Sequence, residues 1–251
     1  MKKVSIITPC FNSQEYIRET YQSVISQTYT NWEWIIIDDC STDKTYEVIK
    51  ELSNRDKRIR IFKTKANSGA ATSRNIGLLE ASGILVAFLD SDDAWPPHKL
   101  EKQISHILKN LVDFSYLNYK TITSKGSILK HLTLDKSYQS KDLLKFNPFA
   151  TSSVIIKKEI IHKNQIRFKE HLRRRQDYIF WYEAIRASKT IELCPDTFSF
   201  YRLGSKGSLS SNKIKMAFIQ WSLYRKEFKL SLISTIKYMT TYTIHGFKKY
   251  F

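Results

Sequence analysis

The stretch ILVAFLDSDDAW, residues 84–95, joins a run of apolar side chains to a cluster of carboxylates. An apolar run of this length favours a short strand that is buried on both faces of a sheet. Three acidic residues then follow within four positions, Asp90, Asp92 and Asp93. Carboxylates held this close repel one another unless a positive charge lies among them. The sequence therefore predicts a buried strand that ends at a site for a cation.

Strands and helices alternate through the first 93 residues. The expected strands lie at 4–8, 32–38, 60–63 and 84–90. Helices are expected between them, and the last of these covers residues 70–82. Asn12 and Glu15 are predicted to cap the first helix as a capping box. This alternation predicts an α/β fold with a mostly parallel, Rossmann-like sheet flanked by helices.

Polar side chains follow three of these strands at the point where each strand ends. In parallel sheets the ligand lies beyond the carboxyl ends of the strands, so these side chains are expected to gather at one crevice. The carboxylates concerned are Asp38, Asp39, Asp90, Asp92 and Asp93. Oxygen ligands suit Mg²⁺ or Mn²⁺, and Mg²⁺ usually completes its shell with substrate phosphates. The alternative is that these acids only cap helices and turns, which is the expectation for Asp43 and Asp93.

The charge of the chain is unevenly distributed. The formal net charge is +17. Residues 1–93 carry 12 basic and 13 acidic side chains, residues 94–210 carry 21 and 10, and residues 211–251 carry 8 and 1. This asymmetry favours an anionic partner for the second part of the chain, either nucleic acid or an anionic membrane face, over a merely solvated basic surface. The three cysteines are odd in number and widely spaced, which predicts no disulfide framework.

Four blocks of the sequence resemble the signature blocks of family 2 inverting glycosyltransferases. The blocks are VSIITPCFN (4–12), IIIDDCSTD (35–43), NSGAATSRNIGLLEASG (67–83) and VAFLDSDDAWPPHKLEKQI (86–104). Their order and spacing both match. The resemblance implies a fold of the GT-A type and the transfer of a sugar from a nucleotide-sugar donor during the synthesis of a bacterial surface polysaccharide.

The resemblance implies donor-binding roles for residues of the first half. Thr8 and Phe11 would line the pocket for the nucleobase and the ribose. Asp39 would accept the imide N–H of a uracil-type base, which favours a UDP-linked donor. Arg74 would either face the donor or lie on the surface of an amphipathic helix, and the sequence leaves both open.

The DSD at residues 90–92 resembles the DxD motif of these enzymes. The resemblance implies that Asp92 is the main ligand of the metal, Mg²⁺ or Mn²⁺, and that Asp90 contacts the ribose or the metal. A metal here would bridge the diphosphate and neutralise charge as the nucleotide leaves. It would also supply the positive charge that the acidic cluster requires.

An inverting transfer needs a general base for the acceptor hydroxyl. The family places it in a Glu-Asp pair at the start of a helix, and the matching stretch is RRRQDYIFWYEAI (173–185). Asp177 is therefore the candidate base, although Gln176 replaces the family's Glu. The alternative is that Asp177 only stabilises the helix dipole.

The stretch FYRLGSKGSLSS (200–211) resembles the family's loop over the pyrophosphate. The His of that loop is absent, and Gly204 stands near its place. Arg202 or Lys206 is expected to contact the phosphate instead.

The chain is expected to divide into a nucleotide-sugar-binding half (1–93), an acceptor-binding half of the same domain (94–210) and a basic amphipathic helical tail (211–251). Residues 231–247 contain no acidic side chain and one lysine, and no apolar run reaches the roughly 18 residues of a spanning helix. An interfacial helix fits better. The alternative is packing on the protein's own core. The expected location is cytoplasmic, peripheral on the inner face of the cell membrane.

The sequence thus predicts a metal-dependent inverting glycosyltransferase with a UDP-linked donor. Its acceptor would be a saccharide on a lipid pyrophosphate, held at an anionic membrane surface. One alternative is a nucleic-acid-binding protein, but no RNP-like, helix-turn-helix or zinc-finger pattern is present, so no nucleic-acid partner is expected. Another is a sugar-nucleotide pyrophosphorylase, which would need a Gly-rich basic loop after the first strand, and TPCFNSQEY (8–16) lacks one.

Overall fold

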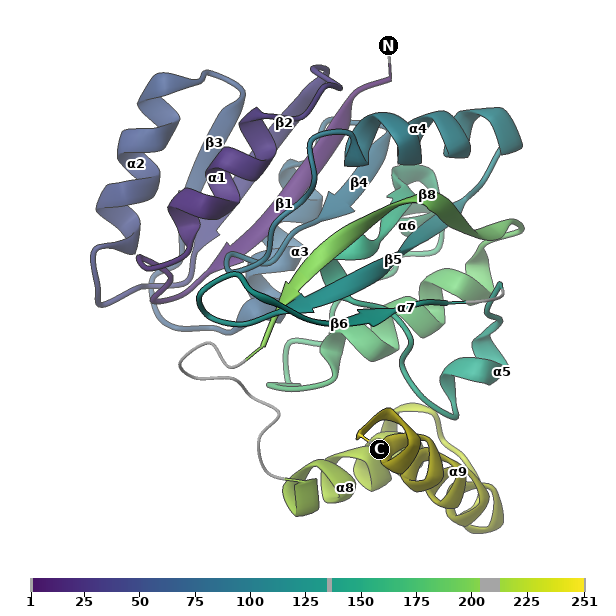
Figure 1. Ribbon diagram of the computed structural model, residues 1–251. Coiled ribbons are helices and arrows are strands. Elements are labelled where there is room, and N and C mark those ends of the chain that lie inside the picture. Colours follow the sequence, from purple (N-terminus) through teal and green to yellow (C-terminus); the bar gives the residue numbers. More distant parts are fainter. Residues whose placement is uncertain (1, 135–136, 204–212, 251) are drawn as a thin grey trace.

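One eight-stranded sheet forms the centre of the protein (Figure 1). The structure is a computed structural model that describes residues 2–134, 137–203 and 213–250. The strands are β1 Val4–Cys10, β2 Trp32–Asp38, β3 Ile59–Lys63, β4 Leu85–Phe88, β5 Phe114–Ile122, β6 Ile128–Leu132, β7 Ile155–Lys157 and β8 Ile191–Arg202. Their order is β3-β2-β1-β4-β7-β5-β6, and β8 pairs with β5.

The helices flank this sheet and then continue beyond it. They are α1 Ile17–Ile25, α2 Thr45–Arg55, α3 Ala70–Glu80, α4 Lys99–Asn110, α5 Ser140–Leu143, α6 Lys158–Lys163, α7 Gln176–Ala187, α8 Lys213–Ser222 and α9 Leu232–Tyr250, with a 3₁₀ turn η1 at Thr151–Ser153 and a π-helical stretch η2 at Leu223–Glu227. Among the helices that the structure describes, none is both long and apolar enough to cross a bilayer.

The sheet is mixed, with two parallel parts. Strands β1 to β4 run parallel to one another, as do β5 and β8, whereas β7 and β6 are antiparallel to their neighbours. Strands β1 and β2 end in register, because Cys10 lies opposite Asp38. The prediction of a mostly parallel α/β sheet flanked by helices is confirmed, and β4 is shorter than the expected 84–90.

Both faces of the sheet are buried at β1, β2 and β4, which explains the largely apolar sequences of these strands. Successive residues of β1 point to opposite faces. Ile6 belongs to a core layer with residues of α1, α2 and α4, and Ile7 belongs to a second layer with residues of α3 and α7. Helix α3 lies very close to β1 at Gly77, where an added Cβ would come within 2.4 Å of the Ile7 side chain.

The predicted capping box at the first helix is wrong. Helix α1 begins only at Ile17 and has no side-chain cap. Asn12 has a left-handed φ of 49°, and its side-chain oxygen accepts hydrogen bonds from the backbone N–H and the hydroxyl of Thr42. Asn12 therefore joins the loop after β1 to the loop after β2, a contact between residues 30 positions apart in the chain.

Glu33 on β2 ties together the amino ends of the strands, at the edge opposite the carboxylates. Its Oε1 accepts hydrogen bonds from the Ser5 hydroxyl at 2.6 Å and from the backbone N–H and hydroxyl of Ser82, each at 2.7 Å. Its Oε2 lies 3.3 Å from Lys3 Nζ and 3.4 Å from a nitrogen of Arg60. Burial alone would raise the pKa of Glu33, but these hydrogen bonds lower it from 4.5 to about 2.

Glu33→Gln should lower the free energy of unfolding at pH 7 by about 2 kcal/mol. Because the folded-state pKa is depressed, the contribution of Glu33 is complete above about pH 4.5 and is lost as the pH falls toward about 2. The variant should therefore lose less stability than the wild type over that interval. Urea unfolding at a series of pH values measures this. Glu159→Gln, at an exposed ion pair with Lys163, is the control and should change stability by less than about 0.5 kcal/mol. An equal loss in both variants would contradict the assignment.

Candidate active site

Carboxylates at the ends of β2 and β4 lie close to the end of β1, the strand between them. Cys10 ends β1, Asp38 ends β2, and Asp90 and Asp92 follow β4. Burial raises the pKa of the Cys10 thiol, and the negative charges of Asp38, Asp92 and Asp90 raise it further. Carboxylates from β2 and from the turn after β4 therefore lie close to the end of β1, as the polar ends of the strands predicted.

Arg74 on α3 supplies one positive charge among these carboxylates. Its guanidinium lies 2.6 Å from Asp90 Oδ1, and the two side chains are 7% and 26% exposed. The guanidinium also lies over the ring of Phe168, 5.4 Å from its centroid. The surface alternative for Arg74 is therefore wrong, because the helix presents this residue to the carboxyl edge of the sheet.

Asp93 is a structural member of the acidic cluster. Its Oδ2 accepts a hydrogen bond from the Ser152 hydroxyl at 2.5 Å, and its Oδ1 accepts one from the backbone N–H of Arg202 at 2.9 Å. Burial raises the pKa of Asp93, and the neighbouring charges of Asp92 and Asp90 raise it further. Asp93 thus joins the turn after β4 to η1 and to the end of β8.

The guanidinium of Arg202 is buried in a net of oxygen acceptors. It donates to Glu19 Oε2 at 2.6 Å, to the backbone oxygen of Asp92 at 2.7 Å, and to the backbone oxygens of Thr123 and Ser124 at 2.8 and 3.0 Å. These contacts hold the end of β8 against the turn that carries the carboxylates. A contact of Arg202 with phosphate stays a prediction.

Two further parts of the predicted phosphate loop cannot be placed. Gly204 and Lys206 lie outside the described residues. The expectation that Lys206 contacts phosphate therefore also stays a prediction.

Asp39 orders the loop between β3 and α3. Its Oδ1 accepts hydrogen bonds from the Thr64 hydroxyl at 3.0 Å and from the backbone N–H of Ser68 at 2.9 Å. Its Oδ2 accepts one from the backbone N–H of Gly69 at 2.6 Å. Gly69 has a φ of 92°, which a residue with a side chain rarely adopts. The carboxylate is buried, and Oδ2 keeps the capacity for a further donor.

Thr8 and Phe11 differ in their access to a ligand. The Thr8 hydroxyl is buried and accepts a hydrogen bond from Trp34 Nε1 at 2.8 Å. Phe11 follows β1 and is 45% exposed. An exposed aromatic ring beside the carboxyl edge suits stacking against a nucleobase. For Thr8, a ligand contact through the side chain stays a prediction.

Asp177 lies in the first turn of α7 and has an amide partner that the sequence did not reveal. Asn147 Nδ2 donates to Asp177 Oδ2 at 3.2 Å. Asn147 Oδ1 accepts from the backbone N–H of Phe149 at 3.2 Å, so the amide must direct its NH₂ group toward the carboxylate. No motif marks Asn147, because the contact joins residues 30 positions apart.

Tyr201, the residue before Arg202 on β8, lies near the acidic cluster. Burial raises the pKa of Tyr201, and the charges of Asp93, Asp90, Asp92 and Asp177 all contribute in the same direction. Of these four charges, that of Asp177 raises the pKa of Tyr201 least. In the sequence, Tyr201 belongs to the motif FYRLGSKGSLSS, which by itself assigns it no role.

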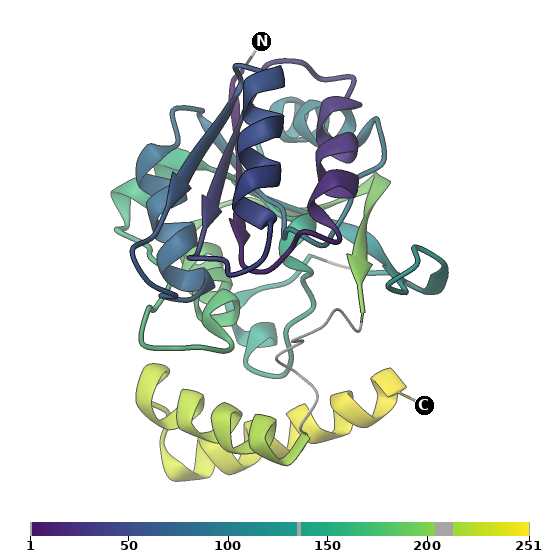
Figure 2. The same ribbon diagram turned by 90° about the vertical axis from the view of Figure 1, so that its left-hand side faces the viewer.

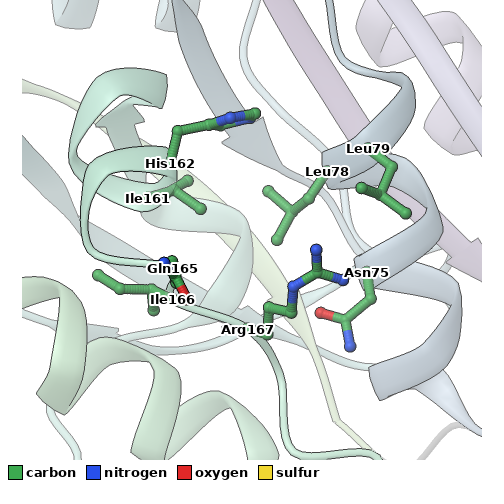
Figure 3. A pocket seen from close by; sticks show the side chains of 8 residues that line it. All are labelled: Asn75, Leu78, Leu79, Ile161, His162, Gln165, Ile166 and Arg167. Carbon is green, nitrogen blue, oxygen red and sulfur yellow. The ribbon is translucent and has the colours of Figure 1, made fainter.

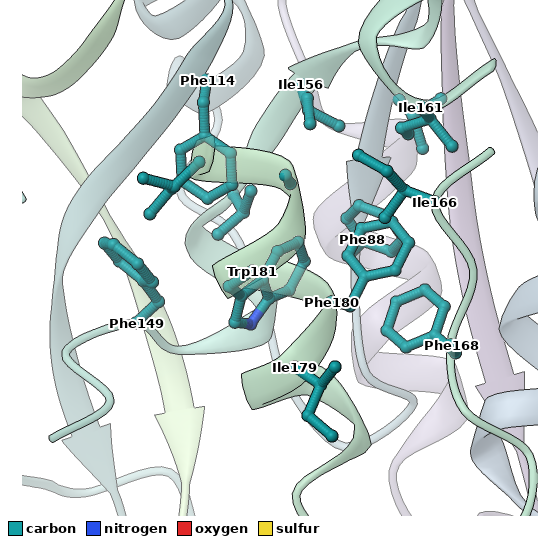
Figure 4. Close-up of a cluster of buried hydrophobic side chains, with 14 of the residues drawn as sticks. Phe88, Phe114, Phe149, Ile156, Ile161, Ile166, Phe168, Ile179, Phe180 and Trp181 are labelled. Atoms are coloured by element: carbon teal, nitrogen blue, oxygen red, sulfur yellow. The ribbon is translucent and has the colours of Figure 1, made fainter. Parts of the chain in front are cut away.

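An aromatic cluster holds α7 against β4 (Figure 4). Phe88, the last residue of β4, contacts Trp181 of α7 edge to face at 5.2 Å between ring centroids. Phe180 stacks on Phe168 at 3.9 Å, and both rings also contact Phe88. Because Asp90 follows Phe88 by two residues and Asp177 precedes Phe180 by three, this packing sets the position of one carboxylate relative to the other.

The carboxylates of this site can hold a divalent metal only if a bound substrate supplies further oxygen ligands. Within the described residues, no group of three His, Cys, Asp or Glu side chains is arranged to hold a metal by itself. Both carboxylate oxygens of Asp93 accept hydrogen bonds that hold the fold, from Ser152 and Arg202, so Asp90 and Asp92 stay the candidate metal ligands. Two carboxylates completed by diphosphate oxygens and water are a common arrangement for Mg²⁺. Because these ligands are carboxylate oxygens, the residues present suit Mg²⁺ or Mn²⁺.

A pocket of about 170 Å³ lies apart from this acidic site (Figure 3). It is lined by residues of α3 and of the segment around α6: Asn75, Leu78, Leu79, Ile161, His162, Gln165, Ile166 and Arg167. Asn75 exchanges two hydrogen bonds with the backbone of Phe168, so its amide serves the fold. No carboxylate lines the pocket, and it is not a candidate for the metal-dependent chemistry.

Residues 5–184 match the family model described as glycosyl transferase family 2. The chain belongs to glycosyl transferase family 2. A glycosyltransferase of this family needs a site for the nucleotide sugar. The carboxyl edge of the sheet is the candidate, because the family-like sequence blocks of this chain meet there. Membership also excludes the reading of the chain as a sugar-nucleotide pyrophosphorylase.

Two relatives of this glycosyltransferase match it along almost the whole length of both chains. WfgD of Escherichia coli, a UDP-Glc:alpha-D-GlcNAc-diphosphoundecaprenol beta-1,3-glucosyltransferase, is 36% identical over 98% of this chain and 94% of its own. TuaG of Bacillus subtilis, a glycosyltransferase assigned to teichuronic acid biosynthesis, is 36% identical over 98% and 96%. Residues 1–349 of TarS from S. aureus, in complex with UDP-GlcNAc, have the same fold, with a TM-score of 0.73 and 20% identity over 96% of this chain and 71% of that one.

Proposed function

We propose that this glycosyltransferase moves a hexosyl or hexosaminyl group, with inversion, from a UDP-linked donor to a saccharide carried on a lipid pyrophosphate. The observation that supports the proposal is the packing of α7 on β4, where Trp181 contacts Phe88 at 5.2 Å between ring centroids. Asp177 lies in the first turn of that helix, and Asp90 and Asp92 follow that strand. This packing supports Asp177 as the base for an acceptor bound beside the diphosphate that Asp90 and Asp92 would hold. The relative WfgD, which by its name acts on a diphosphoundecaprenol-linked sugar, supports the class of acceptor.

Asp90 and Asp92 are proposed to hold Mg²⁺ or Mn²⁺ against the diphosphate. The metal would supply Lewis-acid stabilisation of the negative charge that develops on the departing UDP. Arg74 holds Asp90 in place through its ion pair. Arg202 holds the backbone of Asp92 through its Nε donor. These two arginines therefore position the carboxylates before any donor binds.

Asp177 is proposed to accept the proton of the acceptor hydroxyl. As this proton leaves, the acceptor oxygen attacks the anomeric carbon from the side opposite the UDP, the bond from that carbon to the diphosphate oxygen breaks, and the configuration inverts. Asn147 holds one carboxylate oxygen of Asp177 by donating to Oδ2. The orientation of Asn147 is in turn set by the backbone N–H of Phe149.

Asp39 is proposed to accept the imide N–H of uracil at Oδ2, with Phe11 against the base. Asp39→Ala should weaken UDP binding by about 10- to 100-fold, because a charged hydrogen bond is lost. Isothermal calorimetry with UDP and GDP measures this, and UDP should bind wild-type protein more tightly. Thr64→Val is the control, because it removes one of the loop's hydrogen bonds and keeps the carboxylate. Tighter binding of GDP, or an equal loss in the control, would contradict the role of Asp39.

The experiment that tests the proposed function is a screen of nucleotide sugars by mass spectrometry. The intact protein is incubated with Mn²⁺, a lipid-pyrophosphate-linked sugar and each donor in turn. A product enlarged by one hexosyl or hexosaminyl unit from a UDP-linked donor is the expected result. Transfer only from GDP-linked donors would overturn the donor class, and transfer only to acceptors without a lipid pyrophosphate would overturn the acceptor class.

A further inference from the structure

Helices α8 and α9 present large apolar side chains to the outside. On α9, Leu232, Ile233, Ile236 and Ile244 are between 51% and 81% exposed. At 3.6 residues per turn, these four lie within roughly 120° of the helix circumference. On α8, Phe218 and Trp221, one turn apart, are 73% and 37% exposed. We call these six side chains the outer tail surface.

The opposite side of α9 packs on the protein. Thr235 is buried there, and Tyr238 lies 6.2 Å from the ring of Tyr224. The Tyr224 hydroxyl in turn donates to the backbone oxygen of Leu144 at 2.5 Å. The tail therefore does pack on the body, as one alternative from the sequence proposed. Leu223 and Phe228 pack with residues of α7, whereas α9 packs through hydroxyl-bearing side chains. The aliphatic side remains uncovered by any described residue.

The charge of the tail is almost entirely positive. Residues 211–251 hold eight basic side chains and one acidic side chain. That acid, Glu227, lies 2.8 Å from His171 of the body. Arg225, Lys226 and Lys229, which follow α8, and Lys237, beside the aliphatic stripe, are exposed. Two copies of this tail would repel each other, whereas an anionic surface would attract it.

The tail lies on the same side of the molecule as the candidate active site. In Figures 1 and 2, α8 and α9 lie beyond the edge toward which β1 and β2 run. Arg175, which immediately precedes α7, donates to the Tyr242 hydroxyl of α9, and its guanidinium lies over that ring at 5.4 Å. Helix α9 therefore contacts the body of the protein at Arg175, two residues before Asp177.

We propose that the outer tail surface seats the protein on an anionic lipid leaflet, with the carboxyl edge of the sheet directed toward the lipid. The six apolar side chains enter the boundary between headgroups and acyl chains, and the basic side chains contact the anionic headgroups. This orientation brings Asp177 close to the plane in which a lipid-linked acceptor is confined. The benefit to transfer rests on the proposed function, but the seating on lipid does not.

The test is co-sedimentation of the intact chain with phosphatidylglycerol vesicles and with phosphatidylcholine vesicles. Wild-type protein should bind the anionic vesicles strongly and the neutral ones weakly. Ile233→Glu should lower the partition coefficient by about tenfold or more, because it replaces a membrane-inserted aliphatic group with a charge. Phe218→Glu, on the other helix, should act in the same direction. Leu79→Glu on α3, at a position 62% exposed, is the matched control and should bind as wild type.

Two further readouts separate this proposal from the proposed function. Hydrolysis of the donor without acceptor should be equal in all these variants, and far-ultraviolet circular dichroism should be unchanged. Transfer to an acceptor embedded in vesicles should fall in Ile233→Glu, while transfer to a short water-soluble analogue should not. Equal vesicle binding by wild type, Ile233→Glu and Phe218→Glu would overturn the proposal. So would self-association of the wild type, seen by sedimentation velocity and abolished by Ile233→Glu, in the absence of vesicle binding.

Discussion

Asp177→Asn should lower the turnover of sugar transfer by about 10²- to 10⁴-fold, which is the usual value of general-base assistance. The amide cannot accept the proton of the acceptor hydroxyl at neutral pH. It has nearly the same shape as the carboxylate and can still accept the hydrogen bond from Asn147, so the first turn of α7 should remain intact. Because the base acts on the acceptor, the affinity for UDP should change by less than about twofold.

Single-turnover kinetics and calorimetry with UDP together check this expectation. Glu183→Gln is the matched control, since it makes the same chemical change on the same helix at a half-buried ion pair with Lys169. Its turnover should stay within about twofold of wild type. If Asp177→Asn lost UDP binding instead of turnover, Asp177 would belong to the donor site. If it kept full turnover, another group would have to be the base.

Asp92→Asn should lower transfer by about 10²-fold or more, because a metal at this position is worth several kcal/mol of charge stabilisation in the transition state. Asp90 would stay in place through its ion pair with Arg74, but the metal would lose one of its two proposed carboxylate ligands. The backbone oxygen of residue 92 would still accept from Arg202, so the turn should keep its shape. EDTA should inactivate the wild type to a similar level.

Donor hydrolysis and transfer, each measured with and without EDTA, check the role of Asp92. The binding of Mn²⁺ in the presence of UDP, followed by electron paramagnetic resonance, gives a readout that does not depend on turnover. Asp196→Asn, at an exposed position, is the control and should behave as wild type. Full activity of the wild type in EDTA would remove the metal from the mechanism.

The alternation of strands and helices could be predicted from the sequence, because it depends on residues that are close together in the chain. The run WEWIIID is the whole of β2, and its largely apolar character follows from burial on both faces. The capping box at Asn12 and Glu15 was predicted by the same local reasoning and was wrong. Thr42, which lies 30 positions later, provides a better partner for Asn12 than the first turn of α1.

The sequence by itself determined the fold class, the family and the edge of the sheet at which the carboxylates meet. These follow from hydrophobic periodicity, from turn residues and from short motifs, all of which are local. Only the tertiary structure decided that Arg74 neutralises Asp90, that Asn147 orients Asp177, and that Arg202 is buried against Glu19. These pairs are separated by 16, 30 and 183 positions, and chain topology, rather than local pattern, brings them together. The tertiary structure also decided which side of α9 faces outward, because the composition of this helix is compatible with either side facing inward. The contacts of Tyr238 and Tyr242 turn the aliphatic side outward.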